Sequence, residues 1–173
     1  MKLYRLERVQ ALPVTPAEAW PFFSSPSNLP SLTPPWLKLR VVGDIPARMF
    51  PGMVIPYRVK PVFGLSVAWI TEITHVEEPR YFVDEQRFGP YRFWQHQHRF
   101  SPRPAGLEMT DKVHYGLRYG PLGRLLHALI IRRRLEAIFD FRFAKLERIF
   151  EAGTREEHGE VPSWPQETKK PCD

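Results

Sequence analysis

The chain has 173 residues, of which 43% are hydrophobic and 25% are charged, so it can form one folded domain and is not a disordered chain. The formal net charge is +6, but the positive residues do not form one basic run, and we therefore expect no nucleic acid partner. The single cysteine, Cys172, excludes an internal disulfide and any zinc site built from several cysteines.

The first predicted elements are a strand and two short helices. Residues 3–12 alternate in character and carry charges, which predicts a strand and not a signal peptide. Thr15 is placed to cap a helix, with Pro16 at the first helical position and Glu18 where a capping box requires it. The prolines of "SSPSNLPSLTPPW" end this helix early and predict a second short helix or turn.

Six further strands are predicted after the short helices. Turn-forming stretches such as "GDIP", "EEPR" and "SPRPAG" separate them. The predicted strands are 36–43, 52–60, 65–76, 80–88, 91–101 and 106–117. Short connections between consecutive strands predict an antiparallel meander.

A long helix is predicted from Gly120 to about Glu151, with its apolar residues near helical spacing. These residues are Leu122, Leu125, Leu129, Phe139, Phe143, Leu146 and Phe150. The longest apolar run, "LLHALII", is shorter than the ~20 residues of a membrane span, and we expect a cytoplasmic protein. Residues 152–173 are polar and contain prolines, which predicts a tail after a single domain at 1–151.

Four stretches carry a resemblance to a known family: "NLPSLTPPWL" (28–37), "FVDEQRFGPYRFWQHQHRF" (82–100), "MTDKVHYGLRYGPLG" (109–123) and "IFDFR" (138–142). With the order of elements, they resemble the START-related (SRPBCC) helix-grip superfamily, or birch-pollen-allergen-like fold. Within it they are similar to the bacterial branch labelled "polyketide cyclase/dehydrase or lipid transport". The resemblance implies an α+β fold, in which a curved antiparallel sheet of about seven strands wraps around the C-terminal helix. It also implies a cavity between sheet and helix for a lipid, a quinone or a polyketide-like molecule.

Alternation along the strands separates an inner face from an outer one, and the inner face is apolar with a few polar exceptions. The inward residues that we expect to bind a ligand are Trp69, Phe82, Asp84, Gln86, Phe88, Trp94, His96, His98, Phe100, Met109, Asp111 and Tyr115. Thr71, Ile73 and His75 are also expected to point inward. Turns at 89–91 and 101–106 place His96 opposite both Asp84 and Asp111, and His98 opposite Met109.

Three functions fit this face. Binding of a hydrophobic small molecule is favoured, because apolar walls with sparse polar groups are typical of ligand pockets. The alternative is a cyclase or dehydratase that uses His96 with Asp84 and Asp111 as acid–base groups. A third is a stress or partner-binding protein whose aromatic side chains fill a vestigial pocket. Two histidines at i and i+2 form only a weak zinc pattern, so we expect no metal and no cofactor.

The arginines of the long helix leave two questions open. Arg132–Arg134 either contact a phospholipid surface or form a solvated helix face, which is the more frequent role of such a run. The sequence does not decide whether Arg142 and Arg58 face the cavity. The outer faces carry no decisive apolar patch, so the oligomeric state also stays open.

Overall fold

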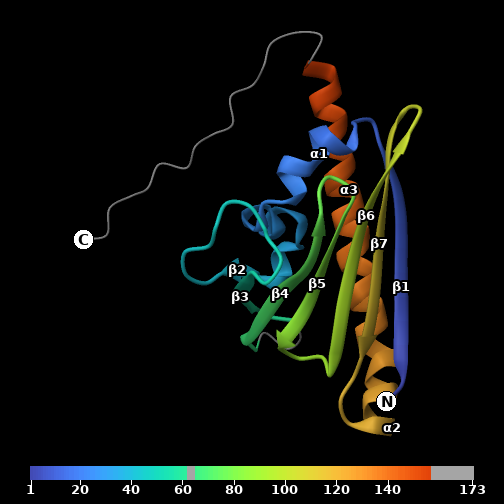
Figure 1. The fold of residues 1–173 in the computed structure, drawn as a ribbon. Helices are drawn as coiled ribbons and strands as arrows, with labels where there is room; N and C mark the ends of the chain where they lie inside the picture. Colours follow the sequence, from blue (N-terminus) through green and yellow to red (C-terminus); the bar gives the residue numbers. More distant parts are fainter. Residues whose placement is uncertain (62–64, 157–173) are drawn as a thin grey trace.

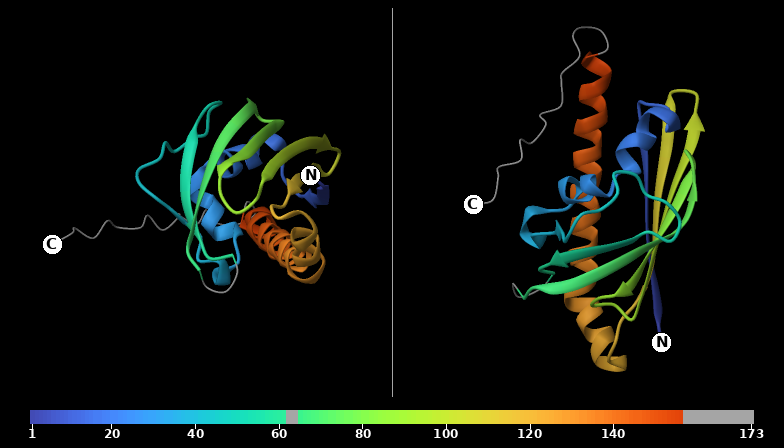
Figure 2. Two further views of the ribbon diagram at one scale, coloured as in Figure 1. Left: turned by 90° about the horizontal axis from the view of Figure 1, so that it is seen from below. Right: turned by 60° about the vertical axis from the view of Figure 1, so that its left-hand side comes forward.

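The computed structural model describes residues 1–61 and 65–156, and the side chains of those up to residue 151. Its seven strands form one antiparallel sheet in the order β1-β7-β6-β5-β4-β3-β2. The strands are β1 (Leu3–Leu12), β2 (Arg40–Val41), β3 (Val54–Val59), β4 (Val67–Glu77), β5 (Tyr81–Phe88), β6 (Phe93–Arg103) and β7 (Gly106–Gly116). The sheet curves around a long C-terminal helix, which confirms the predicted α+β helix-grip fold (Figures 1 and 2).

The C-terminal helix is one run of three parts. It consists of α2 (Gly120–Leu126), a π-helical turn η3 (His127–Ile131) and α3 (Arg132–Glu156). Figure 2 shows it on the concave side of the sheet, where an amphipathic helix can bury its apolar face. The residues of α3 that it buries are Leu135, Phe139, Arg142, Leu146 and Phe150.

The predicted apolar face of this helix is wrong in its first part. Leu122, Leu125 and Leu129 are 66%, 56% and 61% exposed. Phe143, in α3, was also expected on the apolar face and is 38% exposed. The π-helical turn explains why the three leucines are exposed, because it adds about one residue to the helical repeat and so rotates α2 relative to α3. The leucine face of α2 therefore does not continue the buried face of α3.

Short helices follow β1 as predicted. Helix α1 (Pro16–Phe23) begins with the expected capping box: the Thr15 backbone N–H donates to Glu18 Oε2 at 2.7 Å, and the Glu18 backbone N–H donates to Thr15 Oγ1 at 3.3 Å. The 3₁₀ helices η1 (Pro26–Leu32) and η2 (Pro35–Leu37) come next.

The predicted strand 36–43 is wrong in large part. It contains most of η2 and only the two residues of β2. Pro34 and Pro35 favour a tight turn over a ladder, because proline fixes φ and lacks an N–H donor. Lys38 then has φ of 45°, a left-handed conformation that ends η2 and delays the strand.

The predicted register is right on one side of β6 and wrong on the other. Asp84 pairs with His96 as expected, but Asp111 pairs with His98, and His96 pairs with Val113. The β6–β7 pairing continues to Arg103 and Gly106, so the turn has two residues and lies later than predicted. Because the register differs by two residues, the inward faces of β7 are unchanged.

A β-bulge in β4 overturns one further expectation. The register shifts between Ile73 and His75, and His75 is exposed rather than inward. After the bulge, Val76 is the residue that packs against the core. A bulge adds one residue to one strand and so exchanges the two faces beyond it.

The core consists of two clusters of buried side chains. The large cluster contains Trp20, Phe23, Phe82, Phe100 and Leu146 among others. The small cluster consists of Leu6, Trp94, Val113, Tyr115, Leu135 and Phe139. Both clusters lie between the concave face of the sheet and the elements that cover it.

Candidate functional site

A layer of buried polar residues separates the two clusters. We call His96 and His98 of β6, Asp111 of β7 and Arg142 of α3 the polar layer; each is at most 7% exposed. On each element these residues lie between a member of the small cluster and a member of the large one. The flanking pairs are Trp94 and Phe100 on β6, Val113 and Met109 on β7, and Phe139 and Leu146 on α3.

Asp111 is the centre of the polar layer. Its Oδ2 accepts a hydrogen bond from Arg142 Nε at 2.9 Å. Its Oδ1 lies 3.1 Å from His96 Nε2 and 2.8 Å from His98 Nδ1. Burial would raise the pKa of Asp111, but the Arg142 guanidinium and the two imidazoles hold it well below its usual value. Asp111 is therefore a buried carboxylate with its charge compensated. The structure thus answers the open question on Arg142, which turns inward, whereas Arg58 is exposed.

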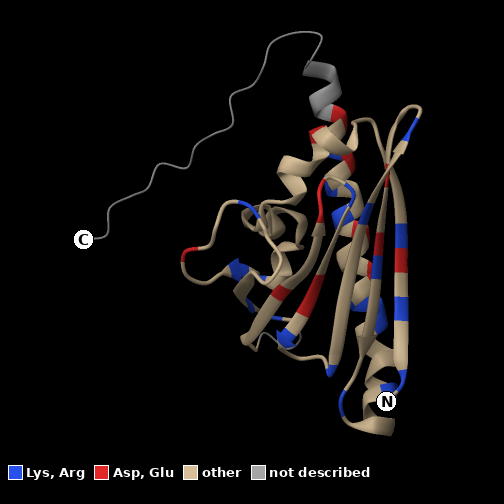
Figure 3. Ribbon diagram, in the orientation of Figure 1, with Lys and Arg blue, Asp and Glu red and all other residues tan. Residues whose placement is uncertain are grey.

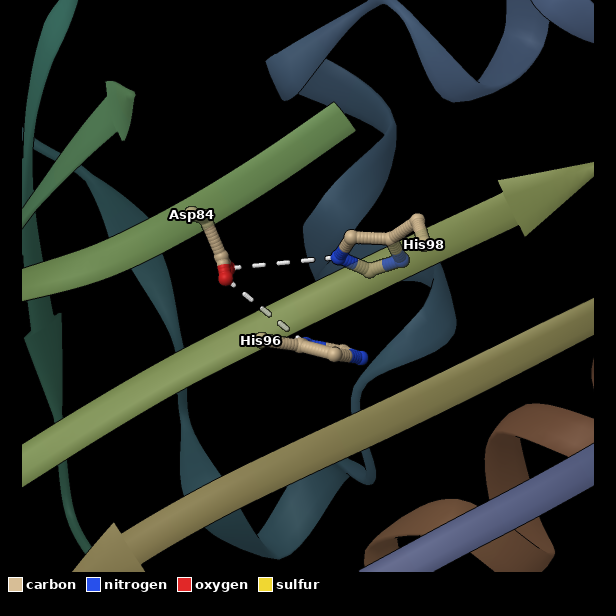
Figure 4. A group of neighbouring side chains, drawn as sticks. All are labelled: Asp84, His96 and His98. Carbon is tan, nitrogen blue, oxygen red and sulfur yellow. Dashed lines mark ion pairs between the residues drawn. The ribbon is translucent and has the colours of Figure 1, made fainter. Parts of the chain in front are cut away.

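Asp84 approaches the same histidines from β5. Figure 4 shows its carboxylate and the two imidazoles pointing toward one another. His96 Nδ1 lies 3.7 Å from Asp84 Oδ2, and His98 Nε2 lies 4.0 Å from Asp84 Oδ1. These distances are too long for hydrogen bonds, and the buried Oδ2 has no hydrogen-bond partner among the described residues. Asp84 thus offers an acceptor that the described protein atoms leave unused.

The two histidines differ in their charge preference. Burial and the neighbouring His98 lower the pKa of His96, although Asp84 and Asp111 act in the opposite direction. Burial also lowers the pKa of His98, but the two carboxylates outweigh it and raise this pKa above the ordinary value. His98 therefore holds a proton more readily than His96 does.

A pocket reaches one side of this group. It has a volume of about 70 Å³ and lies between β3, β4 and β5, the segment from α1 to η1, and α3. Its lining is Phe22, Phe23, Ser25, Pro26, Asn28, Leu29, Leu32, Met49, Ile55, Tyr57, Thr71, Ile73, Phe82, Asp84, His98 and Arg142. His98 lines the pocket and His96 does not, so His96 lies behind it in the polar layer.

Only Phe82, Asp84 and His98 of the predicted ligand-binding residues line the pocket. The remaining ones fall into four groups. Trp69, Trp94, Phe100, Met109 and Tyr115 pack in or against the two clusters, and His96 and Asp111 belong to the polar layer. Gln86 closes the β5–β6 turn through hydrogen bonds with the backbone of Tyr91. Phe88 was expected inward but is 59% exposed, because it pairs with Ile70 beyond a register shift in β5 that exchanges the two faces.

Several pocket residues were not predicted. Phe22, Phe23 and Leu29 come from the short helices, whose apolar residues were the available signal for a covered end of the sheet. Tyr57 lies on the buried face of β3, and burial, with a smaller effect of the Asp84 charge, raises the pKa of its hydroxyl. Tyr57 therefore adds a protonated hydroxyl to the polar side of the pocket.

Asp84, His96 and His98 also form a potential cation site. Each offers one ligand atom, and these atoms lie within 4.8 Å of one another. Two imidazoles and a carboxylate suit zinc or ferrous iron, whose bonds of about 2.1 Å would require the side chains to move closer. The raised pKa of His98 and the nearby Arg142 charge oppose a cation, since a proton on His98 occupies the lone pair that a metal needs.

Comparison with solved structures shows the same fold at low sequence identity. TTHA0849 from Thermus thermophilus is 22% identical, with 88% of this chain and 99% of that chain covered and a TM-score of 0.60. Ara h 8.0201 is 15% identical, with 84% and 98% covered and a TM-score of 0.54. The di-domain ARO/CYC StfQ from the steffimycin biosynthetic pathway is 12% identical, with 88% and 52% covered and a TM-score of 0.66. These neighbours confirm the helix-grip fold expected from the sequence.

Sequence comparison identifies the family. No curated protein sequence matches the chain. The sequence profile of one family, described as "Polyketide cyclase / dehydrase and lipid transport", matches residues 4–151, which include every strand and most of the C-terminal helix. The chain therefore belongs to the polyketide cyclase / dehydrase and lipid transport family.

Proposed function

We propose that this protein binds a small hydrophobic molecule with one polar end in the pocket between sheet, short helices and α3. The observation that carries the proposal is the composition of the pocket. Its walls are mostly apolar, while Tyr57, Asp84, His98 and Arg142 are polar groups close to one another. Apolar walls with a few convergent polar groups are what small-molecule sites present. The family description, which includes lipid transport, supports the same function.

The polar groups favour a ligand with a hydroxyl or carbonyl group. A ligand hydroxyl would donate to the buried Oδ2 of Asp84, which has no hydrogen-bond partner among the described residues. A ligand carbonyl would accept from the Tyr57 hydroxyl, whose pKa is raised, or from His98 when it is protonated, a form that its raised pKa favours. A quinone or a polyketide-like molecule offers such groups, whereas a pure hydrocarbon would leave the carboxylate oxygen unpaired.

The size of the pocket implies movement of its cover. A volume of about 70 Å³ is well below the roughly 300–1,000 Å³ of pockets for drug-sized ligands. Phe22, Ser25 and Leu29 are only partly buried and lie where the short helices cover the pocket. We expect this segment to move outward when a ligand of lipid size enters.

A pair of serine substitutions tests the proposal. Ser25 lines the pocket, whereas Ser27 is exposed and does not. Ser25→Trp should therefore fill the entrance and weaken binding of the fluorescent probe ANS at least about tenfold, while Ser27→Trp should change the Kd less than about twofold. Phe22→Ala should strengthen binding.

Native mass spectrometry gives an independent measurement. Protein purified from its expression host should carry a small molecule that is absent from Ser25→Trp and present in Ser27→Trp. Equal ANS affinity in the wild-type protein and both tryptophan variants, with no co-purified molecule, would contradict the proposal.

The second candidate is acid–base catalysis in the same pocket. It is favoured by one observation: His98 and Asp84 both line the pocket, so a proton can pass between a ligand and a histidine–carboxylate pair. Alternation and register had pointed to His96 for this role, but the pocket favours His98.

A polyketide thioester substrate distinguishes catalysis from binding alone. If the protein is a cyclase, His98→Gln should lower kcat at least about 100-fold while ANS still binds. His96→Gln should lower it less, because His96 does not line the pocket. If the wild-type protein does not turn over such thioesters, the catalytic candidate fails and the binding function stands.

A further inference from the structure

An exposed apolar stripe lies at one end of the molecule. Leu122, Leu125, Leu126 and Leu129 are 66%, 56%, 40% and 61% exposed. Their spacing of i, i+3, i+4 and i+7 places them on one face of α2 and the π-helical turn. We call these residues the leucine stripe. Tyr119, immediately before α2, is 77% exposed.

The other side of this helical segment provides its attachment to the fold. The buried Gly123 lies against the backbone of Arg118, where a Cβ would come within 2.1 Å of the carbonyl oxygen. The ring of His127 stacks on Tyr4 with centroids 3.6 Å apart, and its Nε2 lies 2.8 Å from the Tyr115 hydroxyl. Ile131 packs against the small cluster. The leucine stripe therefore points away from the protein while the opposite side is fixed.

The charge around the leucine stripe is mostly positive. Residues 116–135 contain five arginines and no aspartate or glutamate. Arg132 pairs with Glu136, and Arg134 lies over the Trp36 ring, but both side chains remain exposed. Lys2, Arg92 and Arg124 line a hollow of about 260 Å³ at the same end of the molecule. Figure 3 shows basic residues and no acidic ones around α2 and the chain's N-terminus.

We propose that this end of the molecule lies on a membrane surface that contains anionic lipid, with the leucine stripe inserted at the boundary of headgroups and acyl chains. An exposed apolar helix face flanked by arginines is the pattern of an interfacial helix. The exposed Tyr119 is a residue type enriched at that boundary. None of the described helices is long and apolar enough to cross a bilayer, so the contact lies along the surface.

The charge favours a membrane over a second copy of the chain. In an isologous dimer the five arginines of each copy would face those of the other, and the pair with Glu136 would compensate Arg132 alone among the contacts described above. Anionic headgroups supply that compensation, and each cation near the surface adds to binding. This surface is separate from the pocket, because no residue of the leucine stripe lines the pocket.

Vesicle co-sedimentation of the full chain tests the apolar part of the proposal. The wild-type protein should bind vesicles of phosphatidylcholine mixed with phosphatidylserine far better than vesicles of phosphatidylcholine alone. Leu122→Gln combined with Leu129→Gln should weaken that binding at least about tenfold. The matched control is Val9→Gln, which replaces a residue of β1 that is 52% exposed on the outer face of the sheet and should bind as wild type.

The arginines are tested in the same assay. Arg124→Gln and Arg133→Gln should each weaken binding about fivefold, and added salt should do the same to the wild-type protein. Arg103→Gln, at the β6–β7 turn at the opposite end of the molecule, is the control (Figure 1). Circular dichroism and ANS affinity should be unchanged in all variants.

Three results would overturn the proposal. One is wild-type binding that does not depend on phosphatidylserine. Another is equal binding by the leucine variant and Val9→Gln. The last combines two observations: the wild-type protein does not bind vesicles, and light scattering shows it as a dimer while the leucine variant is a monomer. A second copy of the chain would then cover the leucine stripe. A failure of the pocket proposal would not affect these measurements, since they use different residues.

Discussion

Two aspartates on the inner face have opposite surroundings. Asp111 contacts Arg142 and both histidines, so its charge is compensated on every side. Asp84 lies across the same histidines, but its buried Oδ2 has no hydrogen-bond partner among the described residues. Removing Asp111 would leave the buried Arg142 charge without the carboxylate that it bonds, whereas Asp84 makes only the longer contacts of 3.7 and 4.0 Å with the histidines. The first aspartate therefore contributes to stability and the second is available for a ligand.

Replacing each aspartate by the isosteric asparagine should therefore have different effects on the free energy of unfolding. Asp111→Asn should lower the free energy of unfolding by about 3 kcal/mol, because Arg142 stays buried without a carboxylate. Asp84→Asn should change it by less than about 1 kcal/mol. Urea denaturation at neutral pH measures both values. Equal losses of unfolding free energy in the two variants would contradict this difference between the two aspartates.

At the scale of the element, the π-helical turn keeps one side of the helix on the sheet. The inward residues Gly123, His127, Ile131, Leu135 and Phe139 follow one another at steps of four. In a regular α-helix each such step turns by about 400°, so four steps drift by about 160°. A π-helical turn takes up one residue more than an α-helical turn, which offsets much of this drift.

The π-helical turn also gives the helix a pH-sensitive contact. Burial first, and then the charges of Arg132 and Lys2, lower the pKa of His127, while Glu136 acts in the opposite direction. His127 Nε2 lies 2.8 Å from the Tyr115 hydroxyl, which can donate to this nitrogen when the ring is neutral but not when it is protonated. Because the folded pKa is lowered, this stability is fully present above the ordinary value of 6.5 and is lost as the pH falls through the folded pKa.

The comparison with His127→Gln isolates this contribution. The difference in the free energy of unfolding between wild type and variant should be constant above pH 6.5 and should become smaller below it. Urea denaturation at a series of pH values measures that difference. A difference that grows as the pH falls would contradict the assignment of His127 as a neutral acceptor.

The sequence predicted elements better than it predicted their relative positions. Alternation identified the inward residues of β6 and β7, because a period of two follows from strand geometry. The register of β7 was wrong by two residues, because the length of the turn after Arg103 is not visible in the pattern. The pocket was mostly missed, since most of its lining comes from elements that meet only in the folded chain. The rotation of α2 was missed because spacing alone does not show a π-helical turn.

At the scale of the whole molecule, α3 joins the two clusters. Phe139 belongs to the small cluster, Leu146 and Phe150 belong to the large one, and Arg142 lies between them in the polar layer. A defect at any of these positions therefore affects the contact between helix and sheet. The leucine stripe of α2 has no such role, since it faces away from both clusters.

Two alanine substitutions on the C-terminal helix should show this difference. Leu146→Ala removes a side chain that is 1% exposed and should cost about 2–5 kcal/mol, which lowers Tm by roughly 5–15 °C. Leu125→Ala removes one that is 56% exposed and should change the free energy of unfolding by less than about 0.5 kcal/mol. Thermal unfolding followed by circular dichroism compares them. A similar loss in both variants would mean that the leucine stripe is part of the core.

The polar layer has a consequence for which of two alternative pairings the chain selects. A slip of β7 by two residues keeps the same side chains facing inward, so hydrophobic burial hardly distinguishes the slipped pairing from the native one. That slip would carry Asp111 about 7 Å along β6, away from Arg142 and His98. The slipped pairing would leave a buried charge without its partner, which costs much free energy. The difference in apolar burial between the two pairings is small by comparison. In this fold the apolar residues provide most of the driving force, and the four polar ones remove a competing state.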